Sequence, residues 1–289
     1  MEREIGPSGL RVAAIGLGGM PLSIRGRPSE ADAIRTLHAA LDAGMTLIDT
    51  ADVYCLDDDE IGHNERLICK ALRERSDTSR IVVATKGGLE RPKGDWTTNA
   101  RPEHLVRACD KSLAALGVDQ IQLYQLHAPD DEAPFADSVG ALADLRRAGK
   151  IAHVGLSNVS VAEIEEARAI VPVVSVQNRC NPMDRSAWDD GVVQHCAAHD
   201  IAFLPYSPVG GGRGKTKVAN NKTLTMVGAR HGVSPFQVAL AWLLAKSPVM
   251  LPIPGASRIT SAVDSAAAMR LVLTPADHAD LDRAFPTAP

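Results

Sequence analysis

The stretch Ala13-Ala14-Ile15-Gly16-Leu17-Gly18-Gly19-Met20-Pro21 places a short apolar run directly before a glycine-rich turn. Its glycines superficially resemble the phosphate-binding turn that opens a doubly wound α/β sheet. That turn carries a third glycine and leads into a helix, whereas here Pro21 follows. We therefore interpret the segment as a loop after a first buried strand. This interpretation favours a closed barrel over its competitor, the doubly wound sheet.

Seven further apolar runs follow the first one. Short continuous runs, rather than alternating ones, are typical of parallel strands buried on both faces. The eight expected strands span residues 13–15, 46–48, 81–84, 121–126, 151–154, 173–176, 201–204 and 249–251.

Helical patterns with their own start and stop signals separate these runs. Three of them end at Gly44, Gly117 and Gly149, and Ser29 and Thr274 are expected N-caps. No Pro/Gly/Ser-rich linker divides the chain. We therefore predict an α/β protein with one domain over residues 1–289, a (β/α)8 TIM barrel preceded by a β-hairpin over residues 2–12.

Charge and cysteine content exclude several classes of protein. The chain of 289 residues has 31 Lys and Arg against 35 Asp and Glu, a formal charge of -4, and no long basic tract, so no nucleic-acid partner is expected. Its five cysteines are scattered without a C-x-x-C pair, which argues against a disulfide framework and a bound metal. The longest apolar run, 238–245, is too short to span a bilayer, and the N-terminus lacks the pattern of a signal peptide. A cytoplasmic protein without a membrane partner is the simplest expectation.

Polar and aromatic side chains follow the expected strands, where a parallel barrel builds its site. Taken singly, each has an ordinary interpretation: Asp49 as a cap, Tyr54 as packing, Lys86 as a solvated amine and His127 as a loop histidine. Together they form a proton-donating set. A lysine ammonium beside a phenol lowers the phenol pKa, and an aspartate keeps that lysine charged.

The chain resembles the aldo-keto reductases over nearly its whole length. The motifs that carry the resemblance are Leu47-Ile48-Asp49-Thr50-Ala51-Asp52-Val53-Tyr54, Ala84-Thr85-Lys86, Leu123-Tyr124-Gln125-Leu126-His127, Gly155-Leu156-Ser157-Asn158, Val176-Gln177-Asn178, Pro205-Tyr206-Ser207-Pro208 and Ile253-Pro254-Gly255-Ala256. The pattern is nearer to bacterial-type members, including pyridoxal reductases, than to long-looped steroid-type ones. The resemblance implies the same barrel and an NADPH-dependent enzyme.

By position, the resemblance implies that Tyr54 protonates a carbonyl oxygen as hydride arrives. Lys86, paired with Asp49, would depress the pKa of the phenol, and His127 would orient the carbonyl. The implied cofactor set comprises Ser157, Asn158 and Gln177 at the carboxamide, Tyr206 on the nicotinamide ring, Ser207, Val209, Gly210 and Gly211 along the pyrophosphate, and Gly255, Ser257 and Arg258 at the 2′-phosphate. Ser257 itself, Ser261 and Asp264-Ser265 depart from the family pattern, which weakens the expected adenine contacts.

The expected substrate pocket is mostly apolar, with Met20, Leu22, Cys55, Trp96 and Met183 beside the catalytic residues. Such a lining suits an aldehyde or ketone of moderate polarity as the small-molecule partner. Trp96 is equally interpretable as a pocket wall or a packed loop anchor. Two other functions remain open: a non-catalytic, nicotinamide-binding regulatory module, and an aldolase in which Lys86 forms a Schiff base. The sequence gives no sign of the oligomeric state.

Overall fold

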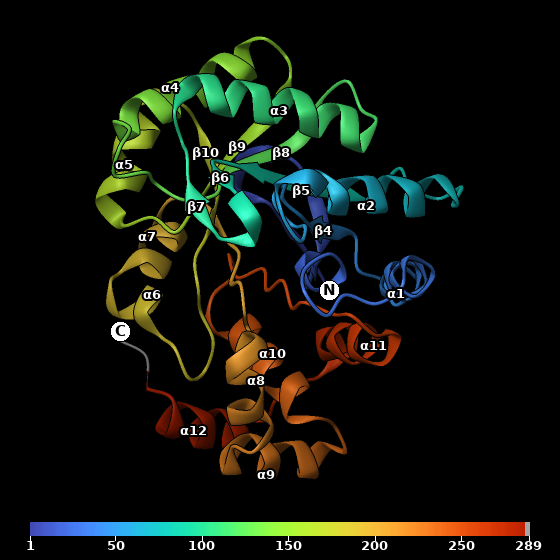
Figure 1. The fold of residues 1–289 in the computed structure, drawn as a ribbon. Helices are drawn as coiled ribbons and strands as arrows, with labels where there is room; N and C mark the ends of the chain where they lie inside the picture. The colour runs from blue at the N-terminus through green and yellow to red at the C-terminus, as the bar shows by residue number, and fades with distance from the viewer. Residues whose placement is uncertain (287–289) are drawn as a thin grey trace.

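A curled parallel sheet of seven strands forms the centre of the computed structural model, which describes residues 1–286 (Figure 1). Along the sheet the order is β11-β10-β9-β8-β5-β4-β3. The strands are β3 (Leu17–Gly18), β4 (Leu47–Asp49), β5 (Val82–Gly87), β8 (Ile121–Leu126), β9 (Ile151–Ser157), β10 (Val173–Gln177) and β11 (Ala202–Phe203). All neighbouring pairs are parallel, so the carboxyl ends of the strands point to one side.

Six of the predicted strands coincide with members of this sheet, but the first does not. Residues 11–13 form β2 outside the sheet, and the barrel strand β3 begins only at Leu17. Ala14 and Ile15 are buried as completely as strand residues although they lie in a bend. Burial therefore produced a strand-like apolar run at a place where the chain changes direction.

The predicted eighth strand, 249–251, is also absent from the strands of the described chain. Its segment nevertheless bridges the two sheet edges: Leu251 N donates to Phe203 O at 2.7 Å, while Gly18 N donates to Pro254 O at 3.0 Å. Pro252 and Pro254 have no backbone N–H, so the ladder toward β3 has acceptors but lacks donors. The prolines thus explain why this segment pairs through isolated bridges and not as a regular strand.

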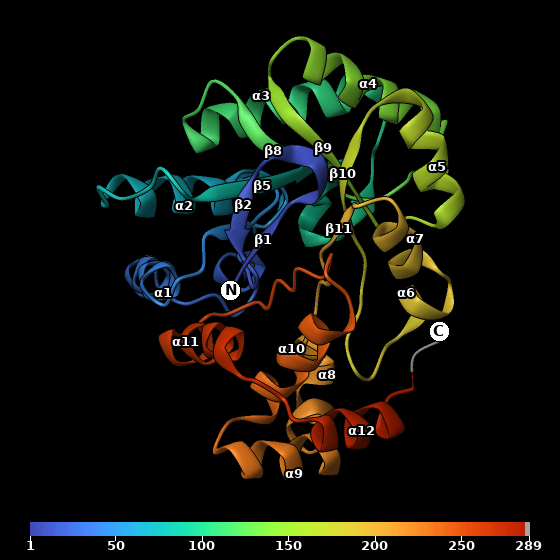
Figure 2. The same cartoon turned by 180° about the vertical axis from the view of Figure 1, so that it is seen from behind.

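The N-terminal segment covers the amino ends of the strands. β1 (Glu2–Glu4) pairs antiparallel with β2 (Arg11–Ala13), and Figure 2 shows both in front of the sheet. Ile5 and Val12 pack into the apolar cluster inside the sheet, beside residues such as Leu123. Arg3 donates to the backbone oxygens of Leu244, Ser247 and Met250. Apolar side chains and the Arg3 hydrogen bonds therefore close the amino end of the sheet. The carboxyl end of the sheet is where the molecule has space for a ligand.

Helices form an outer ring around the strands in both views. They are α1 (Glu30–Asp42), α2 (His63–Arg73), α3 (Pro102–Leu116), α4 (Phe135–Arg147), α5 (Val161–Ile170), α6 (Ser186–Asp189), α7 (Val192–Ala198), α8 (Gly211–Ala219), α9 (Lys222–His231), α10 (Pro235–Lys246), α11 (Ile259–Ala267) and α12 (Pro275–Ala284). The predicted caps Ser29 and Thr274 accept hydrogen bonds from Asp32 N and Asp277 N. No described helix is long and apolar enough to cross a membrane.

Candidate active site

A cleft of about 800 Å³ opens at the carboxyl ends of the strands. Twelve of the residues that line it belong to the predicted catalytic and cofactor sets: Asp49, Tyr54, His127, Ser157, Asn158, Gln177, Tyr206, Ser207, Val209, Gly211, Gly255 and Ser257. Met20 and Trp96, from the predicted substrate pocket, also line it. The sheet therefore brings strand-end residues that are far apart in sequence to one cleft, of a size suited to a small ligand.

Lys86 on β5 lies beneath the cleft floor and is fully buried. Its Nζ donates to Asp49 Oδ2 at 2.6 Å, to Thr50 O at 2.8 Å and to Tyr54 Oη at 3.2 Å. Burial lowers the pKa of Lys86, while the facing Asp49 carboxylate opposes that shift. Because all three ammonium hydrogens have partners and Lys86 does not line the cleft, a Schiff-base role is disfavoured.

Asp49 is held by two glutamines from the other side. Gln177 Nε2 on β10 donates to Asp49 Oδ1 at 2.7 Å, and Gln125 Nε2 on β8 donates to the same oxygen at 3.2 Å. Gln125 was not among the predicted site residues. The run Ile121–Leu126 holds two amides, and the signal was that Gln125, unlike Gln122, falls at a fully buried position, where an amide requires a polar partner.

The Tyr54 hydroxyl faces the cleft from the segment that follows β4. Its pKa is raised well above the ordinary tyrosine value, first by burial and then by Asp49 and Tyr206. The expectation of a depressed phenol pKa is therefore not met in the protein alone, because burial and the Asp49 charge both raise this pKa. Tyr54 accordingly holds its proton at neutral pH.

His127 follows β8 and lies across the cleft from the tyrosine, with ring centroids 5.8 Å apart in an edge arrangement. Burial lowers the pKa of His127 well below its ordinary value, and the positive charge of Lys86 adds to the effect. The imidazole is thus neutral at pH 7. Its Nδ1 is buried without a hydrogen-bond partner in the described chain.

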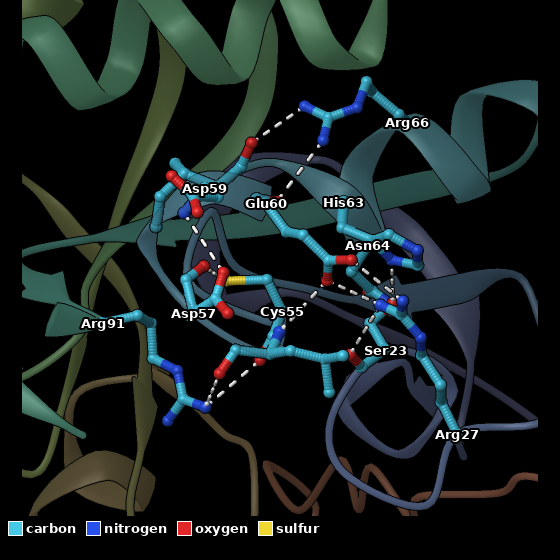
Figure 3. Close-up of polar contacts among 12 residues, drawn as sticks. Ser23, Arg27, Cys55, Asp57, Asp59, Glu60, His63, Asn64, Arg66 and Arg91 are labelled. Carbon is cyan, nitrogen blue, oxygen red and sulfur yellow. Dashed lines mark hydrogen bonds and ion pairs between the residues drawn. The ribbon is translucent and has the colours of Figure 1, made fainter. Parts of the chain in front are cut away.

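Arginines brace the segment after Tyr54 on several sides (Figure 3). Arg27 donates to both carboxylate oxygens of Glu60, at 2.7 and 2.9 Å. Arg66 donates to Ile61 O at 2.8 Å, and Arg91 donates to Leu56 O at 2.9 Å. These contacts hold residues 56–61, which follow the phenol along the chain, in place.

Trp96 is both a wall of the pocket and a packed anchor of its loop, the two interpretations that the sequence left open. It lines the cleft, and its ring is 6.4 Å from that of Tyr54. The Arg91 guanidinium lies 3.9 Å from the Trp96 ring centroid, so the wall is also anchored.

Three expected substrate residues do not line the cleft. Leu22 is buried in the core between the sheet and the helices, as an apolar side chain favours. The Cys55 thiol donates to backbone oxygens of Val53 and Asp57, and burial raises its pKa to about 11. Met183 lies in an exposed turn beside α8 and α9 residues, at a separate shallow hollow. Pro21 and Leu89 add apolar surface to the cleft in their place.

The residues expected at the carboxamide are linked to one another. Asn158 Nδ2 donates to His127 O at 3.0 Å and to Ser157 Oγ at 3.1 Å, and its Oδ1 accepts from Tyr206 Oη at 2.9 Å. Asn158 has φ of 58°, a conformation that asparagine tolerates better than most residues. This network fixes the direction of the polar groups at the centre of the cleft.

Two helix N-termini face the remaining length of the cleft. Gly211 and Gly212 line it in the first turn of α8, where backbone N–H groups lack helical acceptors. Gly210, the N-cap residue, has φ of 91°, which favours glycine, but it does not line the cleft. Lys215 also lines this end and was not among the predicted site residues.

At the second N-terminus, Ser257 and Ser261 line the cleft at the start of α11. Exposed Arg258 is the N-cap residue of this helix and lies at the cleft margin, not in its lining. Asp264 instead accepts hydrogen bonds from Ser234 and Gln237 of the neighbouring segment. Neither helix has an acidic residue in its first turn, so both ends suit anionic groups.

Comparisons with known proteins agree with this geometry. The chain is 35% identical over 276 residues to an uncharacterized oxidoreductase of Schizosaccharomyces pombe, covering 94% of this chain and 86% of that protein. A thermostable aldo-keto reductase solved with the inhibitor epalrestat matches with a TM-score of 0.84 and 27% identity, over 98% and 99% of the two chains. An aldo-keto reductase from Klebsiella pneumoniae solved with NADPH matches with a TM-score of 0.82 and 26% identity, over 100% and 96%.

The family model described as the aldo/keto reductase family matches residues 14–285. This match covers the whole sheet, the ring of helices and every residue of the cleft described above. The chain belongs to the aldo/keto reductase family of oxidoreductases.

Proposed function

We propose that the protein reduces an aldehyde or ketone to an alcohol with NADPH, using Tyr54 as the proton donor. The observation that carries this proposal is the buried Lys86 ammonium, which contacts both Asp49 Oδ2 and Tyr54 Oη under the cleft floor. A charge-paired lysine in that position stabilises the tyrosinate that remains after proton transfer. We further propose that residues 249–255, which bridge β11 and β3, take the place of the eighth strand and complete the barrel.

The donor set and shape of the cleft fit NADPH along its length. Ser157 and the Tyr206 ring offer a hydroxyl and an aromatic face to the nicotinamide end. The first turn of α8 offers backbone N–H groups to the pyrophosphate, and a Cβ at Gly211 would lie 2.7 Å from Ser207 Oγ, so the close approach needs glycine. Ser257 and Arg258 at the start of α11 would hold the 2′-phosphate.

The protein's own residues perform the acid chemistry. A reduced nicotinamide, when bound, supplies a hydride. Tyr54 holds its proton at neutral pH, because both the ordinary and the raised tyrosine pKa lie well above 7, and it donates that proton to the carbonyl oxygen as negative charge develops there. His127, neutral because its pKa is lowered, offers a ring N–H to the same oxygen and stabilises its charge. Lys86 then compensates the charge left on Tyr54.

The cleft wall supports a substrate of moderate polarity. Trp96, Leu89 and Met20 provide apolar surface to the cleft, and Trp96 and Leu89 lie beside Tyr54. Arg179 and Lys215 are the charged side chains in the cleft lining apart from Asp49. We therefore expect neutral aromatic and aliphatic carbonyl compounds, with pyridoxal among them, to be turned over.

The test is loss of NADPH absorbance with aromatic and aliphatic aldehydes, quinones, diketones and pyridoxal, with NADH in parallel. Tyr54→Phe is the matched control, since it removes only the hydroxyl. Turnover that falls about 100-fold or more in Tyr54→Phe, with unchanged NADPH affinity, is the expected result. Tight NADPH binding without turnover of any carbonyl would favour the regulatory module, and a borohydride-trapped adduct on Lys86 would favour the aldolase.

A further inference from the structure

We propose that Glu165, His195 and His199 form a binding site for a divalent transition-metal ion, Zn²⁺ being the ion that suits this ligand set. Glu165 lies on α5, His195 lies on α7, and His199 is the residue that ends α7. The two helices lie side by side on the outside of the sheet in both views (Figures 1 and 2). None of the three residues lines the catalytic cleft, so this site is separate from it.

The spacing of the two histidines places both rings on one side of the helix end. They are four residues apart, and their ring centroids lie 4.3 Å apart with a 39° tilt. One ligand atom from each of the three residues can be chosen so that all lie within 4.8 Å of one another. A tetrahedral zinc ion with bonds of about 2.1 Å has ligand atoms about 3.4 Å apart, so small side-chain rotations suffice.

The hydrogen bonding of His199 leaves the correct ring nitrogen for an ion. Its Nδ1 lies 3.0 Å from His195 O. Because a backbone oxygen only accepts, Nδ1 must carry the hydrogen, and Nε2 then carries the lone pair when the ring is neutral. Metal-binding histidines are typically oriented in this way by a carbonyl on the opposite nitrogen.

His195 also presents a ring nitrogen that makes no hydrogen bond within the described chain. Its Nε2 is buried and lies 2.9 Å from Glu165 Oε1, but the contact lacks hydrogen-bond geometry, and Nε2 has no hydrogen-bond partner among the described residues. A buried imidazole nitrogen beside a carboxylate, without a hydrogen bond joining them, provides two adjacent metal ligands. Two imidazoles and one carboxylate are a set that zinc accepts, with water in the fourth position.

Arg168 competes with the ion for Glu165. It forms an ion pair with Glu165 Oε1 from one turn along α5 and, with the two histidines, lowers the pKa of Glu165. The carboxylate is therefore ionised and ready to bind, but metal entry requires Arg168 to move aside. Glu165 is half exposed and has room to rotate. An occupied site would link α5, which follows β9, to α7, which follows β10.

The experiment is calorimetric titration of the tag-free, full-length protein with Zn²⁺, and with Co²⁺ as a visible-absorption probe of coordination. We expect one saturable site, weakened about tenfold or more in each of His195→Gln, His199→Gln and Glu165→Gln. Arg168→Gln should bind Zn²⁺ more tightly because it removes the competing cation. His278→Gln, which changes a histidine on α12, is the matched control and should bind like wild type.

Glu165 and His199 are exposed and Arg168 and His195 are only partly buried, so circular dichroism should report folded variants. Zn²⁺ should also raise the Tm of the wild type and leave that of the three ligand variants unchanged, because only an ion bound to the native state stabilises it. No saturable binding by wild type, or equal binding by wild type and all three ligand variants, would overturn the proposal.

Discussion

Gln177 Nε2 donates a 2.7 Å hydrogen bond to Asp49 Oδ1, although three strands separate β10 from β4 in the sheet order. The contact crosses the interior at the carboxyl ends of the strands. Gln125, on β8 between them, donates to the same Asp49 oxygen and accepts from Gln177 at 3.2 Å. The two amides therefore fix the carboxylate that pairs with Lys86.

Gln125→Met should lower kcat about tenfold or more without changing NADPH affinity. The variant removes one hydrogen bond to a charged carboxylate, which is worth about 1.5–3 kcal/mol. Gln125 is fully buried and does not line the cleft, so it reaches the cleft only through its contacts with Asp49 and Gln177, and Gln177 keeps its own bond to Asp49 in this variant. Steady-state kinetics and cofactor titration measure the two effects.

Gln177→Met is the matched comparison, because Gln177 has the same bond to Asp49 but also lines the cleft. It should lower both kcat and NADPH affinity. Equal kcat for wild type and Gln125→Met would contradict the positioning role of Gln125.

Acidification should destabilise the wild type more than His127→Gln. Burial lowers the pKa of His127 in the folded protein below the ordinary value of 6.5, which the unfolded chain regains. Below pH 6.5 the unfolded chain therefore binds more protons at this position, and the free energy of unfolding falls by at most about 1.4 kcal/mol per pH unit.

Urea unfolding at pH 7.5, 6.5 and 5.5 measures this difference. Burial also lowers the pKa values of His63, His104 and His153, but these residues are common to both proteins and cancel in the comparison. Parallel pH curves for the two proteins would show that His127 titrates normally.

Arg91→Met should raise KM for aromatic carbonyls several-fold while kcat changes little. Arg91 stacks on Trp96 and donates to the backbone oxygens of Cys55 and Leu56. Without it, the Trp96 wall loses its anchor, but the Tyr54 and Lys86 contact remains. Acrylamide quenching provides a second readout, because Trp96 is half exposed whereas Trp188 and Trp242 are buried.

Arg91→Lys is the control for charge. It keeps a cation but loses the planar group that stacks and donates in a fork, so it should resemble Arg91→Met rather than wild type. Wild-type KM and quenching in both variants would contradict the anchoring role.

Six of the eight expected strands, and the grouping of Asp49, Tyr54, Lys86 and His127 at one site, could be predicted from the sequence, because buried parallel strands and strand-end polar residues leave local patterns. The first and eighth expected strands were wrong for a common reason: whether a buried segment forms a regular strand depends on partners far away in the sequence. Ala14 and Ile15 are as buried as strand residues, so only the turn toward Leu17 distinguishes them. At the other edge, Pro252 and Pro254 remove donors from a segment that packs like a strand.

The site shows the same division between local and distant effects. The residues of the Asp49, Tyr54, Lys86 and His127 set were predicted, but the direction of the Tyr54 pKa shift was not, because it depends on complete burial. Gln125 was overlooked because its partner Asp49 is 76 residues away in sequence. Met183 was expected in the pocket as part of its apolar lining, yet its turn faces residues of α8 and α9 instead.

Gly87→Ala should destabilise the protein, and Tyr124→Phe should partly reverse the loss. A Cβ at Gly87 would lie 2.1 Å from the Tyr124 hydroxyl oxygen and 3.1 Å from Cζ. Overpacking of this kind costs about 1–3 kcal/mol. The hydroxyl is also buried without a hydrogen-bond partner in the described chain, so Tyr124→Phe alone should stabilise the fold by about 1 kcal/mol.

Because Gly87 directly follows Lys86 on β5, the clash should also reduce kcat in Gly87→Ala. Removing the hydroxyl in the double variant relieves the closest contact, so both stability and kcat should recover together. A double-mutant cycle by urea unfolding should therefore give a favourable coupling between the two substitutions. Additive effects would mean that β5 shifts without pressing on Tyr124. Recovery of stability without kcat would mean that the position of Lys86 does not depend on the strand end that Gly87 occupies.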